Sequence, residues 1–208
     1  MAEGVLLIIS GPSGVGKGTV CRYLLKIRDT VSLSVSTTTR PPRPGEQEGV
    51  EYHFASLPDF KNMIEKGAFL EWAVVHGDYY GTNLEPVKSA LAAGENLILE
   101  IDVQGAIQVK EQIPDAVAVF LAPPSLEALQ ERIKGRGTES AEKIKERLTT
   151  ALKEMDAYPL YDYVVVNDQV AGAAALIDQI INVEQSRVSR GAKPPGWGGE
   201  KDDLSFNR

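Results

Sequence analysis

The chain has 208 residues, of which 43% are hydrophobic and 25% charged, and its formal net charge at pH 7 is −7. This length suits one compact core with inserted lobes and is short for two independent domains. The acidic balance argues against a protein that coats nucleic acid, so a phosphate site must depend on a few local cations. A single cysteine, Cys21, excludes an intramolecular disulfide. Because no stretch approaches 18 apolar residues, we expect a cytoplasmic protein without a membrane partner.

The first segment has the pattern of a strand, a glycine-rich turn and a helix. An apolar run at 5–9 leads into SGPSGVGKGT at 10–19, and an amphipathic stretch follows at 20–28. The glycines let successive backbone N–H groups converge on one anion, and Lys17 at the helix N-terminus adds a full positive charge. A turn that binds nothing is the alternative. The pattern predicts a loop that binds a nucleotide polyphosphate, made of Gly11, Pro12, Ser13, Gly14, Val15, Gly16, Lys17, Gly18 and Thr19.

One residue departs from the usual phosphate-loop pattern. Gly18 follows Lys17, where the pattern places a Ser or Thr whose hydroxyl reaches Mg²⁺. Thr19 lies about 100° further round the helix and cannot replace that hydroxyl. We therefore expect Mg²⁺ to be held mainly by phosphate oxygens, water and a carboxylate from elsewhere in the chain.

A loop rich in hydroxyls, arginines and prolines follows a strand predicted at 31–36. The segment 37–46 contains three prolines, which exclude a helix and favour an exposed loop of fixed shape. Arg40 and Arg43 in this loop have planar guanidinium groups that suit a bidentate grip on phosphate. A solvated basic turn is the alternative.

A carboxylate lies inside an apolar run after a strand predicted at 50–54 and a helix at 57–66 that Ser56 caps. The run is 69–76, and the carboxylate is Glu71. Burying it is costly unless something pairs with it, so Glu71 lies either on a solvated face or against a ligand. Guanine would fit, because its N1–H and N2–H₂ donate side by side to one carboxylate, whereas adenine presents an acceptor at N1.

Acidic residues end the next apolar strand, which is predicted at 96–102 after a helix that Asn83 caps. Asp102, with Glu100 as the second candidate, is placed to hold Mg²⁺ through water. The alternative is that Asp102 only caps the helix that follows it. A further core strand is predicted at 116–122.

The C-terminal third contains a second cluster of arginines. A helix that starts after Ser125 runs into 132–140, where glycines flank Arg136 and predict a mobile cationic flap; a solvated loop is the alternative. The strand predicted at 161–168 ends in Asn167, at the edge where parallel sheets place ligand contacts. An amphipathic helix follows at 170–187, and its expected buried side consists of Leu176, Ile177, Ile180, Ile181 and Val183.

Taken together, these stretches resemble bacterial guanylate kinases over about residues 4–188. The matching stretches, in the family's order, are GPSGVGKGT, SVSTTTRPPRPGE, FLEWA with GDYYGT, LEIDVQG, FLAPPS, RIKGRGTES and DYVVVND. The resemblance implies an α/β phosphate-loop nucleoside-monophosphate kinase with a parallel-sheet core, an inserted GMP-binding lobe and a helical lid. The implied division is core at 1–36, 83–124 and 159–190, GMP-binding lobe at 37–82, lid at 125–158 and a flexible tail at 191–208.

The resemblance also implies roles for individual residues in the transfer of a phosphoryl group from ATP to GMP with Mg²⁺. Glu71 would read the guanine edge together with Ser36 and Thr82. Asn167 would lie near adenine. The GMP phosphate would be gripped by Arg40, Arg43, Tyr52 and Tyr80, and the catalytic cations would be Lys17, Arg132, Arg136 and Arg147.

The sequence is also compatible with two other functions. One is a kinase for another monophosphate such as AMP, and Glu71 with the hydroxyls of 36–39 argues against it. The other is a protein-interaction module that has lost turnover, and the intact Lys17 and loop arginines argue against that. The sequence leaves the oligomeric state undetermined.

Overall fold

A five-stranded parallel sheet forms the centre of the molecule in this computed structural model, which describes residues 4–75, 77–135 and 141–193. Its strand order is β2-β7-β1-β8-β9, and every neighbouring pair is parallel. The apolar runs expected from the sequence form these strands, because a parallel sheet covered on both faces needs residues that are apolar on both sides. The strands are β1 (Leu6–Ser10), β2 (Val31–Leu33), β7 (Asn96–Glu100), β8 (Val117–Ala122) and β9 (Tyr163–Val166).

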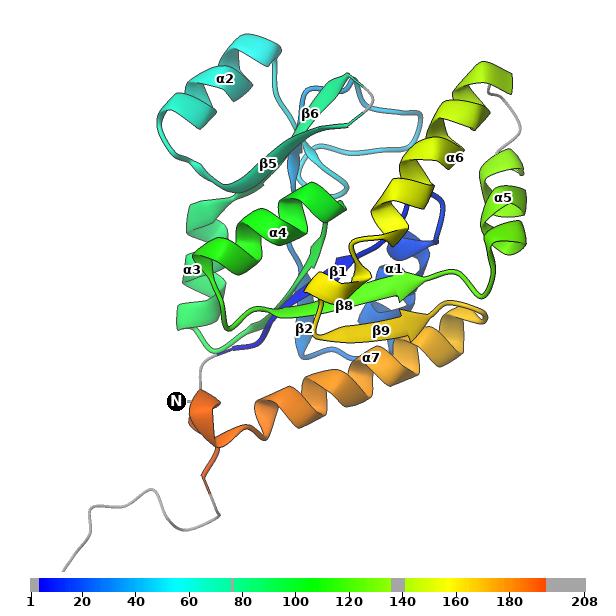
Figure 1. The fold of residues 1–208 in the computed structure, drawn as a ribbon. Helices are drawn as coiled ribbons and strands as arrows, with labels where there is room; N and C mark the ends of the chain where they lie inside the picture. Colours follow the sequence, from blue (N-terminus) through cyan, green and yellow to red (C-terminus); the bar gives the residue numbers. More distant parts are fainter. Residues whose placement is uncertain (1–3, 76, 136–140, 194–208) are drawn as a thin grey trace, which may run out of the picture.

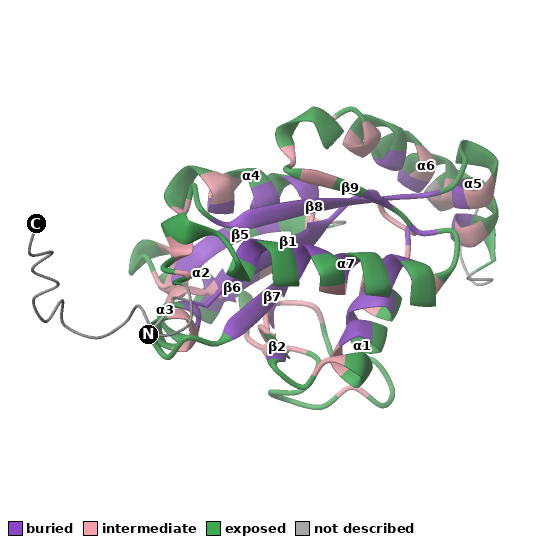
Figure 2. Cartoon of the chain, turned by 90° about the horizontal axis from the view of Figure 1, so that it is seen from below, coloured by how far each residue is buried: buried purple, intermediate pink, exposed green. Residues whose placement is uncertain are grey.

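Helices cover both faces of this sheet, so β1 and β8 are buried along their whole length (Figure 2). Leu7 and Ile9 of β1 pack towards α1 (Lys17–Ile27) and α7 (Val170–Gln185), in a core that includes the free and buried Cys21. Leu6 and Ile8 point the other way. They pack with buried side chains of α3 (Leu84–Ala92) and α4 (Val103–Gln112).

A second sheet of four strands lies apart from the first, with α2 (Leu57–Glu65) beside it (Figure 1). Its strands are β4 (His53–Phe54), β3 (Thr37–Thr38), β6 (Asp78–Asn83) and β5 (Phe69–Val75), in that order across the sheet. The prediction of a loop at 37–46 is thus wrong for its first two residues, which form a strand. Thr37 and Thr38 pair with β6 on one side and β4 on the other, and β-branched residues suit such a position.

The remaining helices connect β8 to β9 and end the described chain. They are α5 (Leu126–Lys134), α6 (Ala141–Met155), η1 (Tyr158–Leu160) and η2 (Val188–Arg190). Ser56 and Ser125 cap helices as expected. Asn83 occupies the N-cap position of α3 but makes no capping bond, because its side chain instead exchanges hydrogen bonds with Thr37. Within the described part of the chain, no helix is both long and apolar enough to cross a membrane.

The buried side of α7 differs from the expected one at two positions. Ile177, Ile180 and Ile181 are buried, but Leu176 is 44% exposed and Val183 is 61% exposed. With 100° between successive residues, the face that contains Ile177 and Ile181 continues to position 184 rather than to 183. A charged residue, Glu184, therefore takes the buried place and is only 1% exposed.

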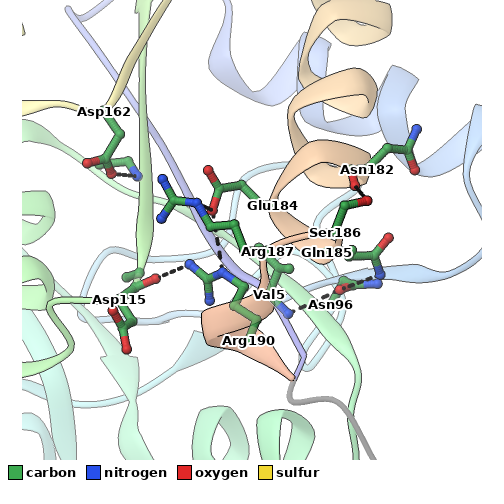
Figure 3. Close-up of polar contacts among 12 residues, drawn as sticks. Val5, Asn96, Asp115, Asp162, Asn182, Glu184, Gln185, Ser186, Arg187 and Arg190 are labelled. Carbon is green, nitrogen blue, oxygen red and sulfur yellow. Dashed lines mark hydrogen bonds and ion pairs between the residues drawn. The ribbon is translucent and has the colours of Figure 1, made fainter. Parts of the chain in front are cut away.

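Figure 3 shows how Glu184 is accommodated at the end of α7. Its carboxylate accepts a 2.6 Å hydrogen bond from the hydroxyl of Tyr163 and pairs with Arg187 and Arg190. Arg190 also donates to the backbone carbonyl of Asp115. A buried carboxylate is tolerated when its partners compensate for lost hydration, so this network fixes the C-terminal helices to the sheet.

Candidate active site

The phosphate loop lies between β1 and α1, as its sequence predicts. Gly16, at the N-cap of α1, has φ 100°, a left-handed conformation in which side chains are strained. A Cβ at Gly16 would also lie 2.8 Å from Nδ2 of Asn167. Lys17 begins the helix, and its ammonium donates a 2.6 Å hydrogen bond to the carbonyl of Gly11 and a 3.4 Å bond to that of Pro12. These bonds direct the ammonium back over the loop.

The charge of Lys17 is balanced by three carboxylates. Burial lowers the pKa of Lys17 below its ordinary value, while Glu154, Glu100 and Asp102 oppose that shift. The site therefore holds a desolvated cation whose charged form nearby carboxylates favour. Such a cation gains stabilisation when a polyanion binds, because its lost hydration is replaced by direct contacts.

Gly18 packs against the carboxylate of Glu100, which limits the room for a Ser or Thr side chain at this position. A Cβ at Gly18 would lie 3.0 Å from Oε1 and 3.2 Å from Oε2 of Glu100, at the end of β7. A side chain at position 18 would therefore require the end of the Glu100 side chain to move by a few tenths of an ångström. Thr19, the neighbouring hydroxyl, is exposed.

Of the two acids considered for a metal, Glu100 is the one beside the loop. Burial raises the pKa of Glu100, and Lys17 and Arg22 oppose the rise. Asp102 instead caps α4, since its Oδ1 accepts a 2.8 Å bond from the N–H of Gly105, as the capping alternative predicted. No cluster of three or more His, Cys, Asp or Glu that could hold a metal occurs among the described residues.

Glu71 lies on the buried side of β5, so the solvated-face alternative is wrong. It is 4% exposed, and its Oε1 accepts a 2.6 Å hydrogen bond from the hydroxyl of Thr82 on β6. Its Oε2 lies so close to Gly105 that a Cβ there would be 2.5 Å away. Burial raises the pKa of Glu71 to about 7, with a smaller contribution from Asp102. A buried carboxylate of this kind is a strong acceptor for paired donors.

The residues expected to grip the GMP phosphate are gathered in part. The guanidinium of Arg40 lies 5.4 Å from the ring centroid of Tyr52, and the rings of Tyr52 and Tyr80 meet edge to face at 5.9 Å. Arg40 also forms a 3.0 Å ion pair with Glu46. Arg43 is exposed. Ser36 lies next to β3, where its carbonyl accepts from the N–H of His53.

On the other side of the phosphate loop, α5 and β9 contribute Arg132 and Asn167. Arg132 donates to the carbonyls of Val15 at 3.2 Å and Asn167 at 2.9 Å. The side-chain amide of Asn167 donates to the carbonyl of Val15 at 2.8 Å. Its Oδ1 is buried and has no hydrogen-bond partner among the residues that the structure describes, which is costly for a folded protein unless water or a ligand supplies a donor.

The helix α6 brings two further charged residues to the loop. Arg147 is 5% exposed, and its Nη2 donates a 3.3 Å bond to the hydroxyl of Ser13. The backbone N–H of Ser13 donates a 2.8 Å bond to Oε2 of Glu154. Of the flap expected within 132–140, the first residues belong to α5, and Arg136 with the rest of 136–140 lies outside the described residues.

Three residues at the site were not predicted from the sequence. Gly105 admits the Glu71 carboxylate, Glu154 contacts the phosphate loop, and Tyr161 donates a 2.9 Å hydrogen bond to the hydroxyl of Ser10. Glu154 had one sequence signal, because it lies two helical turns after Arg147 and so shares its face of α6. The positions of Gly105 and Tyr161 follow only from the packing of distant segments.

Comparisons with known proteins identify the family of this chain. The family model described as guanylate kinase matches residues 3–184. The chain is 49% identical over 188 residues to a guanylate kinase of Desulfitobacterium hafniense, covering 90% of this chain and 94% of the relative. It is 50% identical to one of Caldanaerobacter subterraneus, covering 90% and 91%. A crystal structure of guanylate kinase from Anaplasma phagocytophilum superposes with a TM-score of 0.77 at 33% identity, covering 91% and 90%. The chain belongs to the guanylate kinase family.

Proposed function

We propose that the chain transfers a phosphoryl group from ATP to GMP, giving ADP and GDP, with Mg²⁺. The observation that carries this proposal is the pairing of a phosphate loop with a buried carboxylate on a separate sheet. Lys17 stands at the phosphate loop, and Glu71, bonded to Thr82, stands on β5. One site suits a polyphosphate, and the other suits the adjacent N1–H and N2–H₂ donors of guanine.

The two sheets divide the substrates between them in this proposal. The four-stranded sheet and its loops bind GMP, with Arg40, Arg43, Tyr52 and Tyr80 at its phosphate and Ser36, Glu71 and Thr82 at its base. The phosphate loop binds ATP, and the unpartnered Oδ1 of Asn167 accepts from the adenine amino group. The helices α5 and α6 act as the lid and carry Arg132 and Arg147, and Arg136 belongs to the lid by its place in the sequence.

Catalysis in such a reaction consists of positioning and charge neutralisation. The phosphate of GMP is already an anionic nucleophile, so the chain needs no catalytic base. The loop arginines and the closing of the lid hold the two polyanions in line, and closure keeps water from accepting the phosphoryl group. Lys17 and the lid arginines neutralise charge that moves onto the bridging oxygen of ATP.

The acids beside the loop fit a role towards a divalent metal that arrives with ATP. Mg²⁺ neutralises phosphate charge and keeps several water ligands when it binds to proteins. Glu100, next to Gly18, would hold those waters, and Asp102 is the other candidate, although its Oδ1 is already engaged in capping α4. The loop lacks the hydroxyl that usually supplies a direct ligand, so phosphate oxygens and water supply the rest.

A panel of monophosphates tests the function. ADP release from ATP and Mg²⁺ is followed with GMP, AMP, CMP or UMP as the acceptor, and we expect strong turnover with GMP alone. Turnover with another monophosphate would support the kinase activity but contradict the role of Glu71 in recognising guanine. If folded protein showed no turnover with any of the four, the chain would be a binding module instead. A cytoplasmic location belongs to the same proposal, since the reaction depends on the cellular pools of ATP and GMP.

A further inference from the structure

The helix α6 contacts the phosphate loop through two side chains that meet at one residue, Ser13. Its hydroxyl accepts from Arg147, and its backbone N–H donates to Glu154 at 2.8 Å. Both side chains project from one face of α6, and in Figure 1 the C-terminal end of this helix lies close to the connection between β1 and α1. The lid therefore places one cation and one anion on the loop.

The anion is the unexpected member of this pair. A phosphate loop is built to offer N–H groups to an anion, and a carboxylate is the side-chain group that most resembles a phosphate oxygen as an acceptor. Glu154 is also the carboxylate that acts most strongly on the ammonium of Lys17, ahead of Glu100. Glu154 thus makes contacts of the kind that a bound phosphate would make.

We propose that the carboxylate of Glu154 occupies the phosphate loop in the nucleotide-free protein. When the phosphates of ATP bind, this carboxylate leaves the N–H group of Ser13. This inference rests on the proposed function, which makes ATP the nucleotide of this loop. A carboxylate and a triphosphate repel each other strongly when they share a partly buried site, so they exclude one another from the same N–H groups. ATP then binds a loop from which Glu154 has been displaced.

Displacement of Glu154 connects ATP binding to movement of the lid. Glu154 lies in the last turn of α6, just before η1, and the chain after η1 is held to the core. Tyr161 bonds Ser10 at 2.9 Å, and its ring packs edge to face on Phe120 at 5.1 Å. With that anchor fixed, the loss of the Glu154 contact removes one of the two contacts from α6 to Ser13 and leaves that of Arg147. The contact also lowers the apparent affinity for ATP by the fraction of molecules in which Glu154 occupies the loop.

Binding measurements on two variants test this role. Glu154→Ala removes the charge and the acceptor, whereas Glu154→Gln keeps an acceptor without the charge. The matched control is Glu146→Ala, since Glu146 is an exposed carboxylate on the same helix. Each protein is titrated by calorimetry with a non-hydrolysable ATP analogue, ADP or AMP, without GMP. We expect Glu154→Ala to bind the ATP analogue about 3- to 10-fold more tightly, Glu154→Gln to show a smaller gain, and Glu146→Ala to match the wild type.

The number of phosphates on the nucleotide shows whether Glu154 competes with them for the loop or only supports the structure of the loop. The gain in affinity should shrink from the ATP analogue to ADP and vanish for AMP, and the KM for ATP should fall while the KM for GMP stays unchanged. Equal or weaker binding of the ATP analogue by both Glu154 variants would overturn the inference and leave the kinase assignment intact. Failure of the wild type to bind the ATP analogue would overturn the proposed function together with this inference.

Discussion

The hydroxyl of Thr82 donates a 2.6 Å hydrogen bond to Oε1 of Glu71, from β6 to its neighbour β5. This bond orients the carboxylate, and its other oxygen packs so closely against Gly105 that a Cβ there would lie 2.5 Å from it. Each carboxylate oxygen has two lone pairs, so Glu71 can still accept two donors from a base. Under the proposed function, in which Glu71 reads the guanine edge, the protonation state of Glu71 should control GMP binding.

Binding of GMP should weaken as the pH falls from 8 to 6. Because burial raises the pKa of Glu71 to about 7, the carboxyl is ionised at pH 8 and largely protonated at pH 6, where it cannot accept both guanine donors. Calorimetric titration with GMP measures the effect. The GMP phosphate also titrates near pH 6, so Glu71→Gln serves as the control that shares this titration. Relative to that control, wild-type affinity should fall about tenfold over this range; a constant ratio would contradict the prediction.

Replacing Glu71 by Gln should stabilise the free protein at alkaline pH. A carboxyl whose pKa rises on folding from 4.5 to about 7 loses folding stability as the pH increases through that interval. At pH 8, Glu71→Gln should therefore unfold with a free energy roughly 1–3 kcal/mol higher than the wild type, and near pH 5 the two should converge. Urea denaturation at both pH values gives the comparison. An equal difference at pH 5 and pH 8 would show that the carboxyl is not desolvated.

Restoring the usual loop hydroxyl should damage this protein. In Gly18→Ser the new Cβ would meet Glu100 at 3.0 Å, so one of the two must shift, with a cost of about 1–2 kcal/mol in unfolding free energy. Adding Glu100→Ala should recover that loss, because the two residues are in contact. A thermal-denaturation cycle over the four proteins measures the coupling. If the two substitutions changed stability additively, position 18 and Glu100 would not be in contact. A gain of activity in Gly18→Ser would contradict the steric conflict.

Removing the loop cation should abolish most catalysis without unfolding the chain. Lys17→Ala should lower kcat by at least about 10²-fold, as expected for loss of a group that neutralises transition-state charge. Its circular dichroism spectrum should show a folded protein at the assay temperature, so that the loss of turnover reports on the missing charge. Lys26→Ala, an exposed lysine in the last turn of the same helix, is the control and should keep full turnover. Retained turnover in Lys17→Ala would reject the role of Lys17.

The buried end of α7 should matter for stability alone. Glu184→Ala leaves Arg190 and Tyr163 without their shared partner and should cost about 3–5 kcal/mol in unfolding free energy. Glu184→Gln, which keeps an acceptor for Tyr163, should cost less. Chemical denaturation measures both, and kcat of the folded fraction should equal that of the wild type. A change in kcat without a loss of stability would assign this network a functional role instead.

The sequence by itself determined the order of the elements and the phosphate loop. The apolar runs became β1, β7 and β8, and Lys17 begins α1 directly after the glycine turn. These features depend on local backbone preferences and on burial patterns that repeat within a few residues, so a single segment contains the information. Stretches of this length also carry the family resemblance, which the comparisons confirm.

Only the tertiary structure decided which residues meet across the chain. It placed Glu154 on Ser13, set Gly105 against Glu71, and gave the buried position on α7 to Glu184 rather than Val183. It also shows that Thr37 and Thr38 form a strand. Such contacts depend on how distant segments pack and on small phase differences along a helix, neither of which a local pattern contains. The sequence therefore names the phosphate loop, whereas the fold determines which side chains surround it.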